Sequence, residues 1–269
     1  MTEAVRVCGL KKSYGTHAVL KGLNFGVNQG EIFGILGING AGKTTAMECI
    51  EGLRTYDEGQ INVQGKTGIQ LQSASLPEHI RAMEAVRLFA KWNHCVPDAG
   101  MLKELGIPEF AKKQYYQLST GQKRRLHLAL ALIRDPDLLF LDEPTAGLDV
   151  EGRLSLHSLI RKLRENGKTI VMTSHDMAEV ESLCDRIGIL NGGSLVFLGT
   201  VEELGEKVGK QYRISIRTEH GTEEFESEDI GTDLMKLLEQ YRKRSATILD
   251  LHVDRGSLEQ HFMKITKGE

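Results

Sequence analysis

The sequence has little of what marks metal-bound, disulfide-bonded or membrane-spanning chains. Its 269 residues include only four cysteines, which stand far apart and form no Cys-x-x-Cys pair. That spacing argues against a zinc site or an iron–sulfur cluster and is typical of reduced thiols in the cytosol. No stretch approaches the roughly 18 consecutive apolar residues that a membrane-spanning helix needs. The first residues also lack the layout of a secretory signal. We therefore expect a cytoplasmic chain that reaches a membrane only through a partner.

The chain also lacks an excess of positive charge. Its formal net charge is -3, and lysine and arginine form no basic stripe, so no nucleic-acid partner is expected. Hydrophobic residues make up 40% of the chain and charged residues 26%, proportions that allow an ordinary globular core. The length suits one large domain with an appendage.

The order of short apolar segments predicts an α/β fold. Residues 1–70 contain short, partly alternating segments with glycines between them, and residues 77–134 are mainly helical in pattern. Strands over 138–142, 169–173 and 186–190 then alternate with helices over about 151–166 and 176–184. Strands separated by helices predict a parallel sheet covered on both faces. We expect residues 1–204 to form one domain, with a helical subdomain at about 73–135.

Residues 205–269 differ in pattern and predict a small α+β accessory domain. Alternation over 212–217 and again over 249–253 predicts two strands. An apolar stripe over 234–241 predicts a helix between them, capped by Thr232 or Asp233. Ser257 and Gln260 form a capping box that predicts a closing helix. The expected order is strand–helix–strand–helix.

A glycine-rich loop between a strand and a helix carries the strongest chemical signal. The run matches the phosphate-loop pattern of a glycine, four residues and Gly-Lys-Thr, and its candidate nucleotide-binding residues are Gly37, Asn39, Gly40, Ala41, Gly42, Lys43, Thr44 and Thr45. Glycines let backbone N–H groups turn toward phosphates, and the following helix adds its positive dipole end. Lys43 supplies a point charge and Thr44 a hydroxyl for magnesium. A glycine-rich turn without nucleotide is the alternative.

Two adjacent carboxylates end a buried apolar strand downstream of this loop. Because neighbouring strand residues point to opposite faces, Asp142 and Glu143 can do different work. Asp142 suits a Mg²⁺ shell, and Glu143 suits the general base that polarises an attacking water. A pair of solvated charges is the alternative. With the phosphate loop, the two residues predict ATP as substrate and Mg²⁺ as cofactor.

At residues 3–204 the chain resembles the nucleotide-binding subunits of ABC (ATP-binding cassette) proteins. Leu118-Ser-Thr-Gly-Gln is similar to the family signature, whose usual form is Leu-Ser-Gly-Gly-Gln. The resemblance implies a P-loop NTPase core with a parallel sheet, an antiparallel β subdomain and a helical subdomain. It also implies that Ser119, Gly121 and Gln122 face ATP bound to a second cassette. Thr120 departs from the usual glycine, and Val150 stands where a proline often occurs.

The resemblance assigns further roles. Tyr14 resembles the aromatic residue that stacks on adenine, and Asp149 lies in the loop through which the two sites communicate. Gln72 resembles the glutamine that contacts magnesium and serves hydrolysis, with Gln70 as the alternative register. His175 resembles the histidine that holds the γ-phosphate and the attacking water with Glu143. The remaining histidines that we considered are interpreted as surface residues: His79, His94, His127, His157 and His252.

The same resemblance extends to function. Each motif occurs once, so the chain supplies half of an ATP sandwich, completed by a second copy or a similar chain. The tail resembles bacterial exporter ATPases for drugs, peptides, lipids or polymers, which pair with a separately encoded multi-helix permease. Such a subunit lies on the inner face of the membrane through its permease. Alternatives are a cassette ATPase acting on ribosomes or DNA, a regulatory ATP-binding module, and a phosphotransferase. Four aromatic residues either line the permease contact or belong to the core: Phe89, Trp92, Tyr115 and Tyr116.

Overall fold

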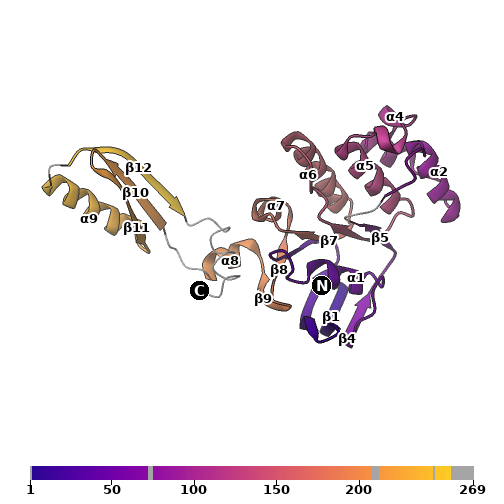
Figure 1. Cartoon of the computed structure of the whole chain (residues 1–269), viewed down its shortest axis with the longest axis horizontal. Coiled ribbons are helices and arrows are strands. Elements are labelled where there is room, and N and C mark those ends of the chain that lie inside the picture. The colour runs from indigo at the N-terminus through magenta and orange to yellow at the C-terminus, as the bar shows by residue number, and fades with distance from the viewer. Residues whose placement is uncertain (1, 72–74, 208–211, 245, 256–269) are drawn as a thin grey trace. The chain divides into compact units, whose positions relative to one another are not determined.

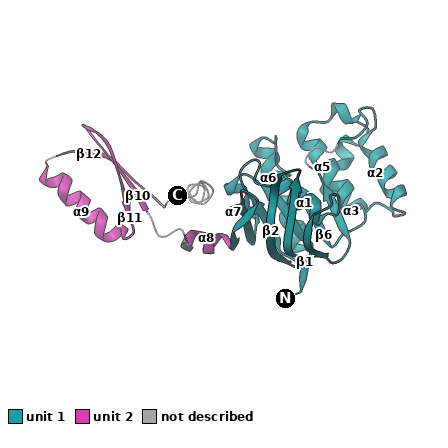
Figure 2. Cartoon of the chain, turned by 60° about the horizontal axis from the view of Figure 1, so that its bottom comes forward, with its two compact units in different colours: residues 1–198 teal, residues 199–269 magenta. Residues whose placement is uncertain are grey.

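A six-stranded sheet forms the centre of the first of two units in the computed structural model (Figures 1 and 2). The structure describes residues 2–71, 75–207, 212–244 and 246–255. The first unit spans residues 1–198 and the second spans 199–269. In sheet order the six strands are β5 (Thr67–Gln70), β6 (Leu138–Asp142), β7 (Thr169–Ser174), β3 (Ile32–Leu36), β8 (Arg186–Asn191) and β9 (Ser194–Gly199).

The parallel sheet predicted from the sequence is confirmed. Each pair from β5 to β8 is parallel, so the carboxyl ends of these strands meet at one edge of the sheet. Every residue of β3, β6 and β7 is buried, as expected for central strands covered on both faces. Asp142 at the end of β6 is in register with Thr173 on β7. This edge is where the sequence places the phosphate loop and the acidic pair.

Alternate residues of the central strands separate two hydrophobic cores. Leu139 and Leu141 belong to a cluster shared with the helical subdomain. Leu138 and Phe140 point the other way, into a cluster shared with α1 (Lys43–Ile50) and the antiparallel sheet. That sheet has the order β2 (His17–Asn28), β1 (Glu3–Tyr14), β4 (Glu58–Val63). The sheet is thus covered on both faces, and its carboxyl edge is held between two packed layers.

Helices supply the rest of the first unit. They are α1 (Lys43–Ile50), α2 (Ala82–Trp92), α3 (Ala99–Glu104), α4 (Ile107–Phe110), a short 3₁₀ turn (Tyr115–Gln117), α5 (Thr120–Ala131), α6 (Val150–Glu165) and α7 (Met177–Leu183). Figure 1 shows α2, α4 and α5 gathered beside the sheet. There Tyr115 is buried and Phe89 packs on the core, whereas Trp92 and Tyr116 are mostly exposed. The four aromatics therefore divide between core and surface.

The second unit contains α8 (Val201–Lys207) and a three-stranded sheet under α9 (Ile230–Lys243). The sheet order is β11 (Gly221–Ser227), β10 (Tyr212–Thr218), β12 (Ile248–Arg255). Two features of this unit differ from those predicted from the sequence. β11 was not predicted, so the described order is strand–strand–helix–strand, and the helix cap lies earlier than Thr232 or Asp233. Asp229 caps α9, accepting hydrogen bonds from the N–H groups of Gly231 and Thr232. The predicted capping box at Ser257 and Gln260 lies outside the described residues.

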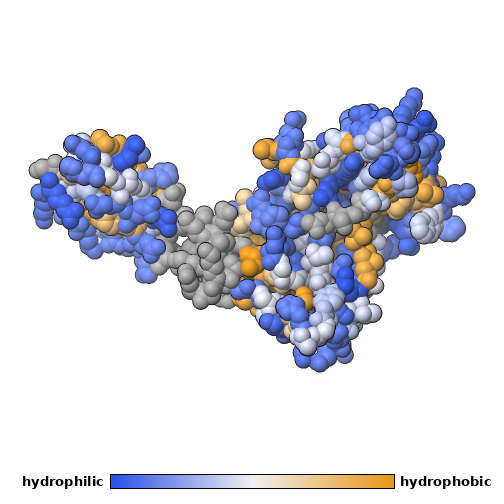
Figure 3. Space-filling view, viewed as in Figure 1, coloured by the Kyte–Doolittle hydropathy of each residue, from blue (hydrophilic) through white to orange (hydrophobic). Residues whose placement is uncertain are grey.

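The surface is mostly polar on the face that Figure 3 shows, where hydrophobic residues appear in small groups. Within the described ranges, we find no helix with the length and apolar character that a bilayer crossing would require.

Candidate nucleotide-binding and hydrolysis site

The glycine-rich loop joins the end of β3 to the start of α1. Two of its glycines are required by geometry. A side chain at Gly37 would place Cβ 2.7 Å from the carbonyl oxygen of Leu190, and Gly42 has a φ of +102°. No described side chain caps α1, in contrast to α5, α6 and α7. The N–H groups of its first turn are therefore suited to an anion.

Lys43 is the one charged side chain of the phosphate loop, and it is buried. Its ammonium group donates to the carbonyl oxygen of Gly37 at 2.8 Å and to that of Ile38 at 3.4 Å. Burial lowers the pKa of Lys43, while the charges of Glu143 and Asp142 act in the opposite direction. The loop thus holds a cation that faces the acidic strand end. Thr44 lies exposed at the next position.

Asp142 lies buried at the carboxyl end of β6, and Thr173 of β7 holds it there. The Thr173 hydroxyl donates to one Asp142 carboxylate oxygen. The same hydroxyl oxygen accepts a hydrogen bond from the backbone N–H of Glu143, at 3.0 Å. Burial raises the pKa of Asp142, whereas the Thr173 hydrogen bond lowers it. One hydroxyl therefore orients both acidic residues, a role that the sequence analysis did not foresee.

Glu143 has a φ of +43°, a backbone conformation that residues other than glycine rarely adopt. Its carboxylate oxygen Oε1 lies 3.2 Å from Nδ1 of His175. The two residues directly follow the neighbouring strands β6 and β7, so the parallel sheet brings together positions 32 residues apart. A strained backbone at a strand end is typical of functional sites. The geometry places the predicted base and the predicted switch histidine in contact.

The signature segment begins α5 through a reciprocal cap. Ser119 Oγ accepts from the backbone N–H of Gln122 at 3.2 Å, and the Gln122 side-chain oxygen accepts from the N–H of Ser119 at 3.2 Å. Gly121 is half-buried. The γ-methyl of Thr120 lies 3.7 Å from the point where a Cβ on Gly147 would stand. Thr120 therefore borders the 146–149 loop of its own chain.

The 146–149 loop is tied to α5 and α6. Arg124 of α5 donates to the carbonyl oxygen of Ala146 at 3.3 Å. Asp149 accepts from the N–H of Gly152 at 2.8 Å and so caps α6. The carboxylate predicted to serve communication between sites thus also fixes the start of a helix.

Tyr14 ends β1 and is 43% exposed, which leaves surface for stacking. The Arg54 guanidinium lies 5.4 Å from the ring centroid and the Lys12 ammonium 5.6 Å from it. Arg54 is itself held by Glu48 at 2.5 Å. The ring is therefore braced by a segment that follows the phosphate-loop helix.

Two of the predicted oxygen donors are of the kind that a magnesium ion prefers. Mg²⁺ prefers oxygen ligands and is usually held by one or two protein carboxylates together with substrate phosphates. The Asp142 carboxylate and the Thr44 hydroxyl are such donors. Gln72, the third predicted ligand, lies outside the described residues. Gln70, its alternative, is buried at the end of β5, and its amide has no hydrogen-bond partner among the described residues.

Of the histidines interpreted as surface residues, one is buried and one is half-buried. His157 is 5% exposed, with Nε2 3.5 Å from the Glu179 carboxylate. His127 is half-buried and bonds Tyr115 at 2.9 Å, and burial lowers its pKa to about 4. Both assignments were wrong because a single histidine carries no burial signal apart from its place on a helix face.

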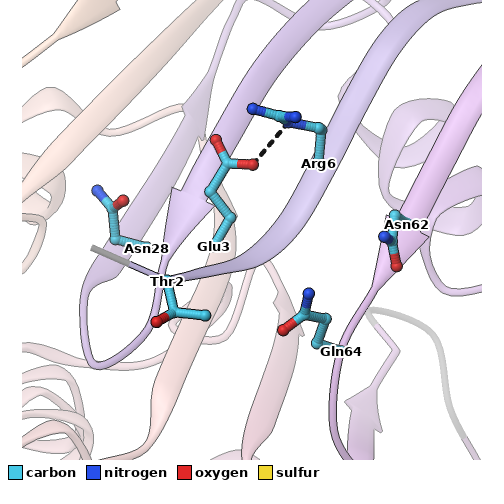
Figure 4. Close-up of a pocket in the computed structure, with 6 residues that line it drawn as sticks. All are labelled: Thr2, Glu3, Arg6, Asn28, Asn62 and Gln64. Carbon is cyan, nitrogen blue, oxygen red and sulfur yellow. Dashed lines mark ion pairs between the residues drawn. The ribbon is translucent and has the colours of Figure 1, made fainter.

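A separate depression of about 760 Å³ lies at one end of the strands of the antiparallel sheet (Figure 4). Thr2, Glu3, Arg6, Asn28, Asn62 and Gln64 line it. Glu3 and Arg6 form an ion pair at 2.7 Å there. None of the predicted site residues that the structure describes borders this depression, so it is distinct from the phosphate loop and the acidic strand end.

Comparisons with known proteins agree with this geometry. A family model described as "ABC transporter" matches residues 20–146, and one described as "AAA domain, putative AbiEii toxin, Type IV TA system" matches residues 112–181. Linearmycin resistance ATP-binding protein LnrL of Bacillus subtilis is 37% identical over 218 residues, covering 74% of this chain and 70% of that protein. Daunorubicin resistance ATP-binding protein DrrA3 of Streptomyces coeruleorubidus is 34% identical over 224 residues, covering 77% and 71%.

Solved structures show the same fold. One described as the ATP binding subunit of an ABC transporter superposes with a TM-score of 0.69 at 25% identity, covering 77% of this chain and 93% of that one. These matches agree with the phosphate loop at Lys43 and the acidic strand end at Asp142, and they establish the family that the sequence resembles. The chain belongs to the ATP-binding cassette family of ABC transporters, and its cassette is an ATPase.

Proposed function

We propose that this chain powers the export of a small molecule, lipid or polymer through a separately encoded permease. The observation that carries the proposal is that relatives of similar length are named for drug resistance or export, among them the Nod factor export ATP-binding protein of Ralstonia nicotianae at 36% identity. The exposed Trp92 and Tyr116 of the helical subdomain are consistent with a protein contact there. In this proposal the chain is cytoplasmic and lies on the membrane only through the permease.

The proposed hydrolytic site needs two copies of the chain. Lys43 lies on α1, which packs in the core shared with the antiparallel sheet. Ser119 caps α5, which packs against β5, α2 and α4. A second copy, related by a two-fold axis, would set its Ser119, Gly121 and Gln122 against ATP held by this chain's phosphate loop. The α5 N-terminus would then meet a phosphate, an arrangement that its dipole favours.

In the proposed mechanism, Lys43 and the loop N–H groups bind the β- and γ-phosphates of ATP, and Tyr14 stacks on adenine. Asp142 and Thr44 would hold Mg²⁺, which neutralises charge on the phosphates when bound. Glu143 accepts a proton from the attacking water while His175 bonds the γ-phosphate. ATP binding closes the dimer and hydrolysis reopens it, and this cycle moves the permease.

Affinity purification from the native membrane tests the proposal. We expect a multi-helix membrane protein to co-purify in stoichiometric amount, with ATPase activity in the same sample. Recovery of a ribosome or DNA instead would establish a non-transport cassette and overturn the export role.

A further inference from the structure

A buried carboxylate on α7 lies beside the predicted hydrolytic pair. Glu179 is 3% exposed and takes one hydroxyl on each oxygen. Thr145 donates to Oε1 at 2.7 Å, and Ser174 donates to Oε2 at 2.5 Å. Hydrogen bonds to a buried carboxylate are among the stronger kinds, because no water is there to solvate its oxygens. The two hydroxyls are therefore held firmly to one group.

These two hydroxyls belong to the segments that carry Glu143 and His175. Thr145 follows Glu143 with only Pro144 between them, and a proline ring restricts the backbone there. Ser174 directly precedes His175. A small cavity of about 140 Å³ is bordered by these residues together with Glu179. One carboxylate thus ties together the two strand ends whose side chains meet at 3.2 Å.

The titratable side chains near Glu179 do not replace the two hydroxyls as its close hydrogen-bond partners. His157 of α6 places Nε2 3.5 Å from Oε1, beyond a good hydrogen bond, and burial lowers the pKa of that imidazole. Ser182 lies 3.4 Å from its other ring nitrogen. Arg153, at the cavity rim, pairs with Asp176 at 2.9 Å.

We propose that Glu179 is a positioning residue for ATP hydrolysis, which sets the distance between Glu143 and His175 through Thr145 and Ser174. The inference rests on the hydrolytic roles proposed for Glu143 and His175. Glu179 touches neither phosphate nor water in this account, so its loss affects turnover and leaves ATP affinity in place. A shift of about 1 Å in such a pair can cost on the order of 100-fold in rate.

Glu179→Gln tests the proposal with little change in shape. The amide keeps one acceptor oxygen, so one of the two hydroxyls must lose its acceptor. Glu181→Gln, on the same helix but exposed, makes the same charge change away from the site and is the matched control. We expect kcat of the full chain to fall about 10- to 100-fold in Glu179→Gln, with ATP affinity unchanged. We expect Glu181→Gln to match the wild type.

A second pair of variants keeps the test valid if Glu179→Gln unfolds. Thr145→Val removes the hydroxyl and keeps the size of the side chain. Thr145→Ser keeps the hydroxyl and removes the methyl group. We expect the valine variant to lose turnover and the serine variant to recover it. If Thr145 acted through packing alone, the smaller serine variant would show the lower thermal midpoint and lower turnover, and the valine variant would resemble the wild type. That result would overturn the proposal.

Adding Thr145→Val to Glu179→Gln measures the coupling between the two residues. If they act through one bridge, the double variant loses little more turnover than either single variant. Wild-type turnover in Glu179→Gln, or fully additive losses, would contradict the inference. The proposed function fails separately, if the wild-type chain does not hydrolyse ATP or if Glu143→Gln keeps full activity.

Discussion

The hydroxyl of Thr173 binds the carboxylate of Asp142 across two neighbouring parallel strands, in a part of the sheet that is closed to solvent. The same oxygen accepts the backbone N–H of Glu143, so both acidic residues take their orientation from one side chain. The register of β6 and β7 produces this arrangement, because Asp142 and Thr173 are directly paired.

Replacing Thr173 by valine should therefore reduce both stability and turnover. The change leaves the partly buried Glu143 N–H without its acceptor, which costs about 1–3 kcal/mol in the free energy of unfolding. We expect ATP turnover to fall about 10- to 100-fold, because both acids lose their orientation. Urea unfolding and steady-state ATPase assays measure the two effects.

Thr169→Val is the matched control for that experiment. Thr169 is also buried on β7, and its hydroxyl accepts the N–H of Gly30 at 2.9 Å, but it lies at the opposite end of the strand. We expect a similar loss of stability with ATPase activity kept. Equal losses of activity in the two variants would mean that turnover follows stability and not the position of the acids.

Ionisation of Glu51 should lower the free energy of unfolding as the pH rises. Burial, followed by the charges of Asp142 and Glu48, raises the pKa of Glu51 to about 7, and neither carboxylate oxygen has a hydrogen-bond partner among the described residues. The folded chain thus holds this proton more tightly than the unfolded chain, so stability is lost as pH rises from about 4.5 to about 7.

Glu51→Gln should remove that penalty. We expect the variant to gain about 2 kcal/mol over the wild type at pH 8 and little at pH 4.5, allowing for partial solvent screening. Urea unfolding at the two pH values measures the gain. An equal effect at both would show that burial does not shift this carboxyl.

His127 should act in the opposite direction. Burial, with the charges of Arg124 and Lys123, lowers its pKa from 6.5 to about 4. The unfolded chain takes up the proton first, so the fold loses stability as pH falls from 6.5 toward 4. We expect His127→Gln to reduce that loss by about 2 kcal/mol. An unchanged acid slope in unfolding experiments would contradict the assignment.

Lys43 and Glu143 should separate nucleotide binding from hydrolysis. Lys43→Ala removes the only charged side chain of the phosphate loop, and we expect ATP binding to be lost in equilibrium titrations. Glu143→Gln keeps the loop, so we expect it to bind ATP, stall hydrolysis and favour a closed dimer in size-exclusion chromatography. Tight ATP binding by the first variant, or full turnover by the second, would break these assignments.

Local patterns predicted the elements that carry the chemistry, because their signals are short in sequence. The strand at 138–142 needs only an apolar run ending in acids, and the loop at 37–45 needs only glycines and a lysine in fixed order. Contacts across 31 and 34 residues, such as Thr173–Asp142 and Thr145–Glu179, depend on strand register and helix packing. Those residues could not be found from spacing alone.

Other misses had a local signal that was too weak or was not used. β11 reads Gly-Thr-Glu-Glu-Phe-Glu-Ser and is mostly exposed, so its acidic composition hides the alternation of an edge strand. His157 lies three residues before the buried Ile160 on α6, and this helical spacing could have predicted its burial. Asp229 was missed because the apolar stripe of α9 begins several residues after the helix does.

The composite site is the central claim, and one mixing experiment tests it most directly. Ser119→Arg keeps an intact phosphate loop but should block the site of its partner, and Lys43→Ala does the reverse. We expect each variant alone to be inactive and an equal mixture to regain about a quarter of wild-type ATPase activity, since half of the dimers then hold one intact site. Wild-type activity in Ser119→Arg alone would contradict the account.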